Sequence, residues 1–255
     1  MLFHLIQFDV EWEVPARNMS IIEKILEQSK PFDSVIVLPE MFNSGFTMNV
    51  GKIAETMNGI TVNWMVNTAK RYSSVIAGSL IIEENNTYYN RFLWTFPDGT
   101  YQYYDKRHLF RMGGEAELFS NGKERIIINY KGFRIIPLIC YDLRFPVWSR
   151  NCNDYDIIVY SASWPASRQN VWNTLLKARA IENQAFVMGI NRTGTDFNGI
   201  NYKGQSQFVD FKGDVIKSAE SVGEFILTAD LDKKELELFR EKFPVWKDAD
   251  SFRLE

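Results

Sequence analysis

The stretch from Gly132 to Arg150 constrains the fold of this chain most strongly. An apolar, β-rich run, residues 133–139, leads directly into Cys140, and a polar stretch with helix potential follows. This pattern predicts a buried strand that ends where a helical turn begins. Unpaired backbone N–H groups and the helix dipole at such a junction favour an anion, so they lower the pKa of a thiol and can hold an oxyanion. We therefore interpret Cys140 as a candidate nucleophile; the alternative is a small core residue.

Two further apolar runs end in charged residues. Residues 35–46, VIVLPEMFNSGF, carry Glu40 after a short run of valine and isoleucine, and residues 103–110, YYDKRHLF, carry Lys106 after an aromatic run. Strand ends are the places where α/β sheets carry reactive groups. Glu40 and Lys106 are therefore candidates for the same site as Cys140, with a loop carboxylate and a surface lysine as the alternatives.

Hydrophobic periodicity predicts strands that alternate with helices and are also joined by hairpins. The predicted strands are residues 2–9, 34–38, 75–82, 88–96, 100–105, 126–130, 133–139, 156–161, 185–190, 206–211, 215–218 and 225–230. The predicted helices begin at Pro15 and cover 61–72, 145–151, 170–183 with Asn170 as the cap, and 232–242. Residues 111–123 and 191–199 are predicted to be loops. The mixture predicts a four-layer α-β-β-α sandwich with mixed sheets, formed as one domain by residues 1–255.

Composition limits the partners and the compartment. The chain has 255 residues, is 45% hydrophobic and carries a net charge of −3 without a basic cluster, so we expect neither nucleic acid nor a membrane surface as a partner. The N-terminal residues 1–14 lack a basic region and a cleavage site, which indicates a first strand, not a signal peptide. Two cysteines without a secretory prefix predict reduced thiols in a cytoplasmic protein. Cys152 is interpreted as a packing residue.

Neither a metal nor an organic cofactor is expected. Two histidines and two cysteines provide few ligands for a zinc site, and the sequence contains no Gly-rich nucleotide-binding pattern. His4 is expected to pack within the first strand. His108 shares a face with Lys106 in an extended run, so a Cys140–His108 pair is an alternative way to activate the thiol.

The chain resembles the nitrilase superfamily of carbon–nitrogen hydrolases over nearly its full length. The resemblance is carried by the segments LPEMFNSGF, DKRHLF, ICYDLRFPVWSR, SASWPASR, KARAIENQAFV and GINRTG. It implies the α-β-β-α fold. It also implies a homodimer in which the helix after Cys140 and the C-terminal tail, about residues 243–255, pack across the two-fold axis.

Amide hydrolysis requires a nucleophile, a base and donors for the tetrahedral oxyanion. Glu40 is the candidate base, since burial makes a carboxylate a stronger base. Lys106 and the backbone N–H of Tyr141 are the candidate oxyanion donors. The resemblance implies a second glutamate in the loop after the lysine; Glu115 fits the expected spacing better than Glu117, and it would orient Lys106 and the substrate.

Within the superfamily the chain is most similar to the ω-amidase branch of bacterial YafV-type proteins, on HLFRM, SWPA, ARAIENQA and EKFPVWKDADSFRL. That resemblance implies small α-keto acid monoamides as substrates, whose far carboxylate requires a cation. The candidate substrate-binding residues are three arginines and three aromatic residues, namely Arg144, Arg168, Arg192, Phe42, Phe46 and Trp164. A structural role for Arg144 and core packing for the aromatic residues are the alternatives. Other amidases of the same chemistry, acting on deaminated glutathione or N-carbamoyl compounds, are the alternative. A catalytically silent binding protein of the same fold is the alternative from a different class.

Overall fold

Two six-stranded sheets form the centre of the protein, for which the computed structural model describes residues 1–219 and 223–253. The strands of the first sheet are, in spatial order, β14 (Phe225–Asp230), β1 (Leu2–Gln7), β2 (Val35–Val37), β3 (Val75–Glu84), β4 (Thr87–Thr95) and β5 (Tyr101–Asp105). Those of the second are β13 (Val215–Ser218), β12 (Gln207–Val209), β9 (Phe186–Asn191), β8 (Ile157–Ala162), β7 (Phe133–Ile139) and β6 (Ile128–Tyr130). A separate hairpin pairs β10 (Thr193–Thr195) with β11 (Asn201–Lys203).

Both sheets are mixed in the same way. The neighbours β1, β2 and β3 run parallel in one sheet, and β7, β8 and β9 run parallel in the other. The flanking strands pair antiparallel, and two successive antiparallel pairings, β3 with β4 and β4 with β5, return β5 to the direction of β3. The carboxyl ends of β2, β3 and β5 therefore lie at one edge of the first sheet.

Alternating side chains of the first sheet serve two separate cores. In β1, Phe3 and Leu5 belong to the apolar cluster between the sheets, and Phe3 meets Phe133 of the second sheet edge to face at a centroid distance of 6.4 Å. Ile6 of the same strand packs on the opposite face, against helix residues such as Ile22. Because successive side chains of a strand point to opposite faces, one apolar strand can be covered on both sides.

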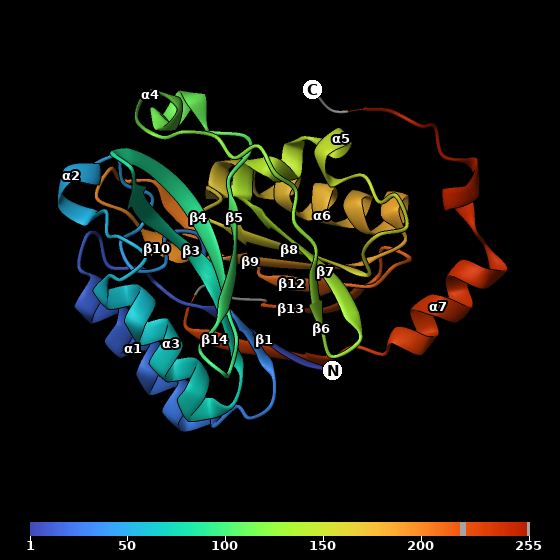
Figure 1. The fold of residues 1–255 in the computed structure, drawn as a ribbon, viewed down its shortest axis with the longest axis horizontal. Helices are drawn as coiled ribbons and strands as arrows, with labels where there is room; N and C mark the ends of the chain where they lie inside the picture. The colour runs from blue at the N-terminus through green and yellow to red at the C-terminus, as the bar shows by residue number, and fades with distance from the viewer. Residues whose placement is uncertain (220–222, 254–255) are drawn as a thin grey trace.

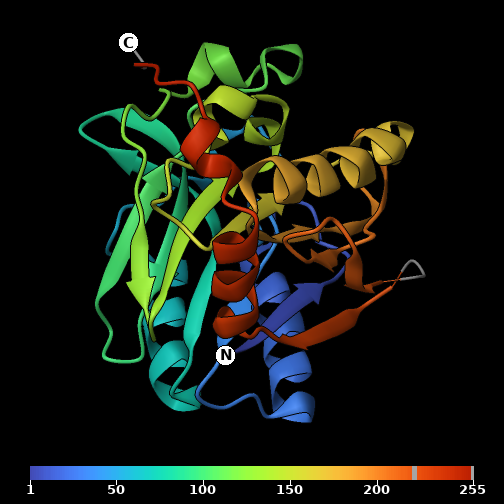
Figure 2. The same ribbon diagram turned by 90° about the vertical axis from the view of Figure 1, so that its right-hand side faces the viewer.

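Helices cover the two outer faces of this sheet pair. They are α1 (Pro15–Ser29), α2 (Val50–Ile53), α3 (Ile60–Tyr72), α4 (Glu115–Leu118), α5 (Pro146–Ser149), α6 (Gln169–Asn183) and α7 (Lys233–Lys242), with 3₁₀ turns η1 (Arg111–Gly113), η2 (Cys140–Arg144), η3 (Ala166–Arg168) and η4 (Val245–Asp248). The helices α1 and α3 lie against the first sheet and α6 against the second (Figure 1). The helix α7 lies at one side, and the segment after it extends toward the end where α5 lies (Figure 2). The predicted α-β-β-α fold is confirmed.

Several local predictions are wrong. The segment 111–123, predicted as a loop, contains η1 and α4, and the loop predicted at 191–199 contains β10. The helix expected after Cys140 is the 3₁₀ turn η2 followed by the four-residue α5. Asn170 does not cap α6, which begins one residue earlier without a side-chain cap. These elements are short, and tertiary contacts rather than periodicity decide them. No helix in the described ranges is both long and apolar enough to cross a bilayer.

Candidate active site

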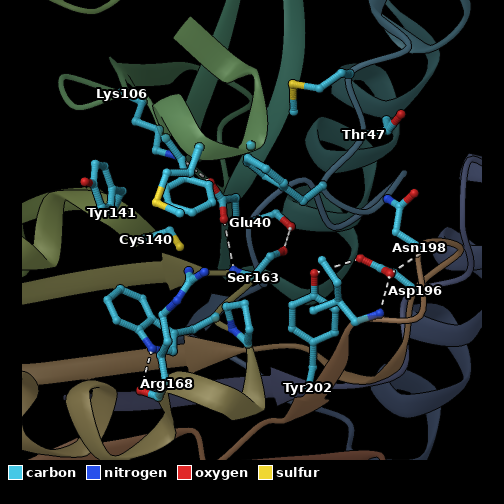
Figure 3. A pocket seen from close by; sticks show the side chains of 18 of the residues that line it. Glu40, Thr47, Lys106, Cys140, Tyr141, Ser163, Arg168, Asp196, Asn198 and Tyr202 are labelled. Carbon is cyan, nitrogen blue, oxygen red and sulfur yellow. Dashed lines mark hydrogen bonds and ion pairs between the residues drawn. The ribbon is translucent and has the colours of Figure 1, made fainter.

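Glu40, Lys106 and Cys140 meet at the edge where β2, β5 and β7 end. Lys106 directly follows β5, Cys140 directly follows β7, and Glu40 lies three residues after β2. The side chains of Glu40 and Lys106 are fully buried, and the half-buried Cys140 lies in the wall of a cavity. Figure 3 shows the three residues gathered on one side of that pocket. Residues far apart in the sequence therefore form one site, because the carboxyl ends of β2, β5 and β7 lie close together.

The Lys106 ammonium group is held between two carboxylates. Its Nζ donates to Glu40 Oε1 at 2.7 Å and to the two carboxylate oxygens of Glu115 at 3.0 and 2.8 Å. Burial lowers the pKa of Lys106, but the charges of Glu115 and Glu40 outweigh this effect and raise the pKa above its ordinary value. Lys106 is therefore a permanent cation at the centre of the site.

Glu115, rather than Glu117, reaches this lysine. Glu115 begins α4 with its side chain buried, and its Oε2 also accepts the backbone N–H of Phe110 at 2.6 Å. Burial raises the pKa of Glu115; the charge of Lys106 opposes the rise and that of Glu40 adds to it. Glu117 is exposed. The spacing argument therefore selected the glutamate that the fold brings to the site.

The backbone and the thiol of Cys140 both have unusual settings. Its φ of 40° lies in the left-handed region, which a non-glycine residue adopts only where its surroundings impose it. Burial raises the pKa of the thiol well above its ordinary value, the adjacent Glu40 carboxylate adds to the rise, and Lys106 opposes it. The predicted lowering of the pKa is wrong, because one short 3₁₀ turn does not compensate for desolvation of a thiolate. The raised pKa favours the protonated thiol beside Glu40.

His108 has a partner other than Cys140. Its Nδ1 lies 2.7 Å from Asp142 Oδ1, and its ring stacks on Phe145 at a centroid distance of 3.8 Å. The fully buried Asp142 also accepts the Tyr104 hydroxyl at 2.8 Å. His108 is not among the described residues that line the cavity around Cys140, so the structure gives the Cys140–His108 alternative no support. His108 instead ties the loop of the lysine to the turn of the cysteine.

A cavity of about 530 Å³ opens in front of the thiol. It is lined by mostly apolar and aromatic side chains with a few polar groups, among them Trp12, Glu40, Phe46, Thr47, Met48, Lys106, Phe110, Met112, Cys140, Tyr141, Arg144, Ser163, Trp164, Arg168, Asp196, Ile200 and Tyr202. Asp196 and Tyr202 lie across the pocket from Cys140 and Lys106 (Figure 3). A cavity of this size and lining suits a small organic substrate.

Two of the predicted substrate-binding residues lie outside the cavity lining. Phe42 is fully buried in the core between the first sheet and its helices, where it packs on Trp64. Arg192 is also fully buried, and its Nη2 donates to Asp9 Oδ1 and to the carbonyl of Val10, each at 2.9 Å. Both predictions are corrected: the turn after β2 directs the Phe42 side chain into the core, and Arg192, directly after β9, is paired inside the protein body.

Arg144 and Arg168 do line the cavity. The guanidinium of Arg144 lies 5.2 Å from the ring centroid of Trp164, and that of Arg168 lies 5.2 Å from the ring centroid of Phe110. Among the described residues, no carboxylate forms an ion pair with either arginine. Two cations held on aromatic faces are therefore available to an anionic substrate.

Several residues of the site carry no local sequence signal. Ser163 N–H donates to Glu40 Oε2 at 2.9 Å, and the buried amide of Asn90 contacts both site carboxylates. Asp196 accepts the Tyr202 hydroxyl at 2.9 Å within the β10–β11 hairpin, which forms the far wall. The strand β10 lies in the segment 191–199, which is predicted as a polar loop, and β11 follows that segment. Within the described ranges, no group of three or more His, Cys, Asp or Glu side chains is arranged to bind a metal ion.

The other cysteine is not a packing residue. Cys152 is exposed, and its backbone N–H donates to the Asp154 carboxylate at 3.1 Å in the turn after α5. The prediction that Cys152 packs in the interior is wrong, because α5 ends at Ser149, three residues earlier. Cys152 is therefore a free surface thiol.

Known proteins match this arrangement over nearly the whole chain. Residues 6–241 match the Carbon-nitrogen hydrolase family. Omega-amidase YafV from Escherichia coli K12 is 46% identical over 250 residues, covering 98% of this chain and 97% of that protein. A 2-oxoglutaramate amidase from Bacillus subtilis is 33% identical, covering 95% of each chain. A CN-hydrolase superfamily protein from Xanthomonas campestris, solved with an arsenic adduct in its active site, is 39% identical with a TM-score of 0.97, covering 100% of this chain and 99% of that one.

The fold, the site and these similarities together define a carbon–nitrogen hydrolase. The chain belongs to the carbon–nitrogen hydrolase family, within the nitrilase superfamily. Within it, the chain falls in the ω-amidase branch. The family and branch that the sequence motifs indicated are therefore confirmed.

Proposed function

We propose that this protein is an ω-amidase, which hydrolyses the terminal amide of small α-keto acid monoamides such as 2-oxoglutaramate and 2-oxosuccinamate to the dicarboxylate and ammonia. One observation carries the proposal: a thiol beside a carboxylate–ammonium pair with an N–O distance of 2.7 Å. Its cavity also holds two arginines that pair with no carboxylate of the described residues. The relatives named Omega-amidase YafV and 2-oxoglutaramate amidase support the substrate class.

The first half-reaction forms a thioester. Glu40 takes the proton of the neutral Cys140 thiol as sulfur attacks the amide carbon, and the carbonyl oxygen becomes an oxyanion. Lys106 and the backbone N–H of Tyr141 stabilise that oxyanion. The proton on Glu40 then passes to the amide nitrogen, the carbon–nitrogen bond breaks, and ammonia leaves. Because the base lies beside the thiol, proton transfer and attack on the substrate carbon occur in one step.

The second half-reaction uses the same base. Glu40, ionised again, takes a proton from water as the oxygen attacks the thioester carbon. The second oxyanion collapses with loss of the Cys140 thiolate, which takes back the proton from Glu40. Glu115 holds Lys106 with two oxygens throughout, so the ammonium stays fixed while Glu40 gains and loses a proton. No oxidant or reductant is consumed.

The decisive experiment measures ammonia release from 2-oxoglutaramate, succinamate and a neutral amide of similar length. We expect strong release from the first two, little from the third, and near-complete loss in the Glu40→Gln variant, since an amide cannot accept the thiol proton. No release from any of the three by folded protein would refute the ω-amidase proposal. Thioester trapping on Cys140 with a panel of N-carbamoyl compounds and deaminated glutathione would then separate another amidase from a silent fold.

We expect Arg168→Ala to raise KM for succinamate about 10- to 100-fold while it changes kcat much less. Losing a charge-assisted hydrogen bond to a carboxylate weakens ground-state and transition-state binding alike. Michaelis profiles for succinamate and for a neutral amide are the measurement, and Arg144→Ala is the matched variant, since both arginines lie on aromatic faces of the cavity. Equal changes for the charged and the neutral substrate would remove Arg168 from the carboxylate role.

We also propose that residues 1–255 act as one domain in a cytoplasmic homodimer that binds neither nucleic acid nor membranes. Free Cys140 and Cys152 suit a reducing compartment. The tail, about residues 243–255, exposes three aromatic side chains, Phe243, Trp246 and Phe252, which supports its packing against a second copy; its residues 254–255 lie outside the described part. Sedimentation of the full chain and of a variant with all three aromatics replaced by serine tests the dimer, and a monomeric wild-type protein would refute it.

A further inference from the structure

Asn90 contacts all three charged residues of the site. It lies in β4, is 1% exposed, and its Nδ2 donates to Glu40 Oε1 and to Glu115 Oε1, each at 2.9 Å. Its backbone carbonyl accepts the N–H of Lys106 at 3.0 Å. One amide group therefore spans the two carboxylates that flank the lysine.

The two carboxylates are thus bridged twice. Glu40 Oε1 and Glu115 Oε1 accept from the Lys106 ammonium, and the same two oxygens accept from the Asn90 amide. Two carboxylates at such short range favour retention of one proton between them, because like charges disfavour ionisation. The ammonium supplies one positive charge for two negative ones. The amide adds two donors without adding a charge, and hydrogen bonds to a carboxylate favour its ionised form.

Other side chains would not fill this position in the same way. An aspartate would place a third carboxyl group against Glu40 and Glu115, and an apolar residue would leave their buried oxygens with fewer donors. The Oδ1 of Asn90 is buried and has no hydrogen-bond partner in the described part of the chain, which is an unfavourable setting for an amide oxygen. Asparagine is present here despite that cost, which points to the two Nδ2 contacts as its role.

We propose that Asn90 is a positioning residue that keeps Glu40 and Glu115 ionised and apart, so that Glu40 accepts the proton of Cys140 instead of sharing one with Glu115. This inference rests on the roles given to these residues in the proposed function. It assigns Asn90 no contact with the substrate. Its effect is on the proton affinity and the orientation of the base.

The consequence is a shift of the acidic limb of activity. The titratable groups that face one another here are Glu40 after β2, Lys106 after β5, Glu115 in α4 and Cys140 after β7. Without the amide donors, the carboxylate pair holds a proton to higher pH, and a protonated pair cannot activate the thiol. The acidic limb of kcat/KM therefore moves upward by about one pH unit or more. The free energy of one hydrogen bond to a charged group corresponds to a shift of about this size.

The test compares Asn90→Ala and Asn90→Asp with Asn183→Asp, all in a Cys152→Ser background. Asn183 is a buried asparagine whose Nδ2 donates to the Arg179 carbonyl at 2.9 Å at the end of α6, away from the site. Two pH profiles are measured, kcat/KM for succinamate and the rate at which iodoacetamide alkylates Cys140. We expect both acidic limbs to move upward in the Asn90 variants, a 10- to 100-fold lower kcat/KM at pH 7, KM within about threefold, and no change in Asn183→Asp.

Several outcomes would overturn the inference. If the Asn90 variants lose activity while the acidic limbs of both pH profiles stay in place, the role of Asn90 is only structural. Unfolding of both Asn90 variants would lead to the same conclusion. Unchanged activity would remove it from the site altogether. The alkylation profile needs no amide substrate, so it decides the role of Asn90 even if the wild-type protein releases no ammonia from succinamate. A failure of the proposed substrate class is thereby distinguished from a failure of this inference.

Discussion

Cys140→Ala abolishes amide hydrolysis and leaves the protein folded. We expect kcat to fall by about four to six orders of magnitude, because the lysine and the carboxylates cannot replace the missing nucleophile. The substitution removes one sulfur atom from a half-buried position, so the free energy of unfolding should change by only about 1 kcal/mol. Ammonia release at high enzyme concentration and thermal unfolding are the two measurements.

Cys152→Ala is the matched control for this variant. Cys152 is a free, exposed thiol outside the cavity, so its replacement should leave turnover and thermal stability unchanged. Mass spectrometry of wild-type protein quenched during turnover should find the acyl group on the peptide that carries Cys140. Turnover of Cys140→Ala within tenfold of wild type would refute the thioester mechanism.

Lys106→Met should damage both catalysis and stability. On the proposed mechanism the variant loses an oxyanion donor, which lowers kcat by about 10²–10³. It also leaves two fully buried carboxylates, Glu40 and Glu115, without their cation. Breaking a buried ion pair from one side costs about 3–5 kcal/mol, which corresponds to a fall in Tm of about 6–20 °C for a chain of this length. Thermal unfolding of the variant and the wild type measures this fall.

The stability loss in Lys106→Met should depend on pH. Burial raises the pKa of Glu115, and in the wild type the charge of Lys106 opposes that rise. Without the lysine, the folded-state pKa stays above its unfolded value, so the variant is most stable where Glu115 is protonated and loses stability as the pH rises through that pKa. The difference in Tm from wild type should therefore widen from pH 5 to pH 8.

The double variant Lys106→Met/Glu115→Gln is the control for this explanation. Removing one of the two uncompensated charges should recover part of the lost stability and flatten its pH dependence, without restoring activity. A difference in Tm that stays constant between pH 5 and pH 8 in the single variant would show that lost packing of the lysine stem, rather than unpaired charge, causes the destabilisation.

Local sequence patterns predicted the strands because these depend on near neighbours along the chain, and they predicted that Glu40, Lys106 and Cys140 lie at strand ends. The apolar runs before Glu40, Lys106 and Cys140 are buried strands that end where the pattern changes, and parallel order brings such ends to one edge. The short elements α4, α5 and β10 escaped prediction because each has too few residues to establish a period. They hold Glu115, the segment that follows the cysteine turn, and part of the far wall of the cavity.

The sequence by itself determined the fold class and the expectation that Glu40, Lys106, Cys140 and Glu115 lie in one site. Only the tertiary structure decided the raised pKa of the Cys140 thiol, the pairing of Arg192 with Asp9 and the place of Asn90 between two carboxylates. The physical reason is the separation along the chain of the residues that interact. Strand and turn preferences act over a few residues, whereas desolvation and charge pairing depend on groups that folding brings together from distant parts of the chain.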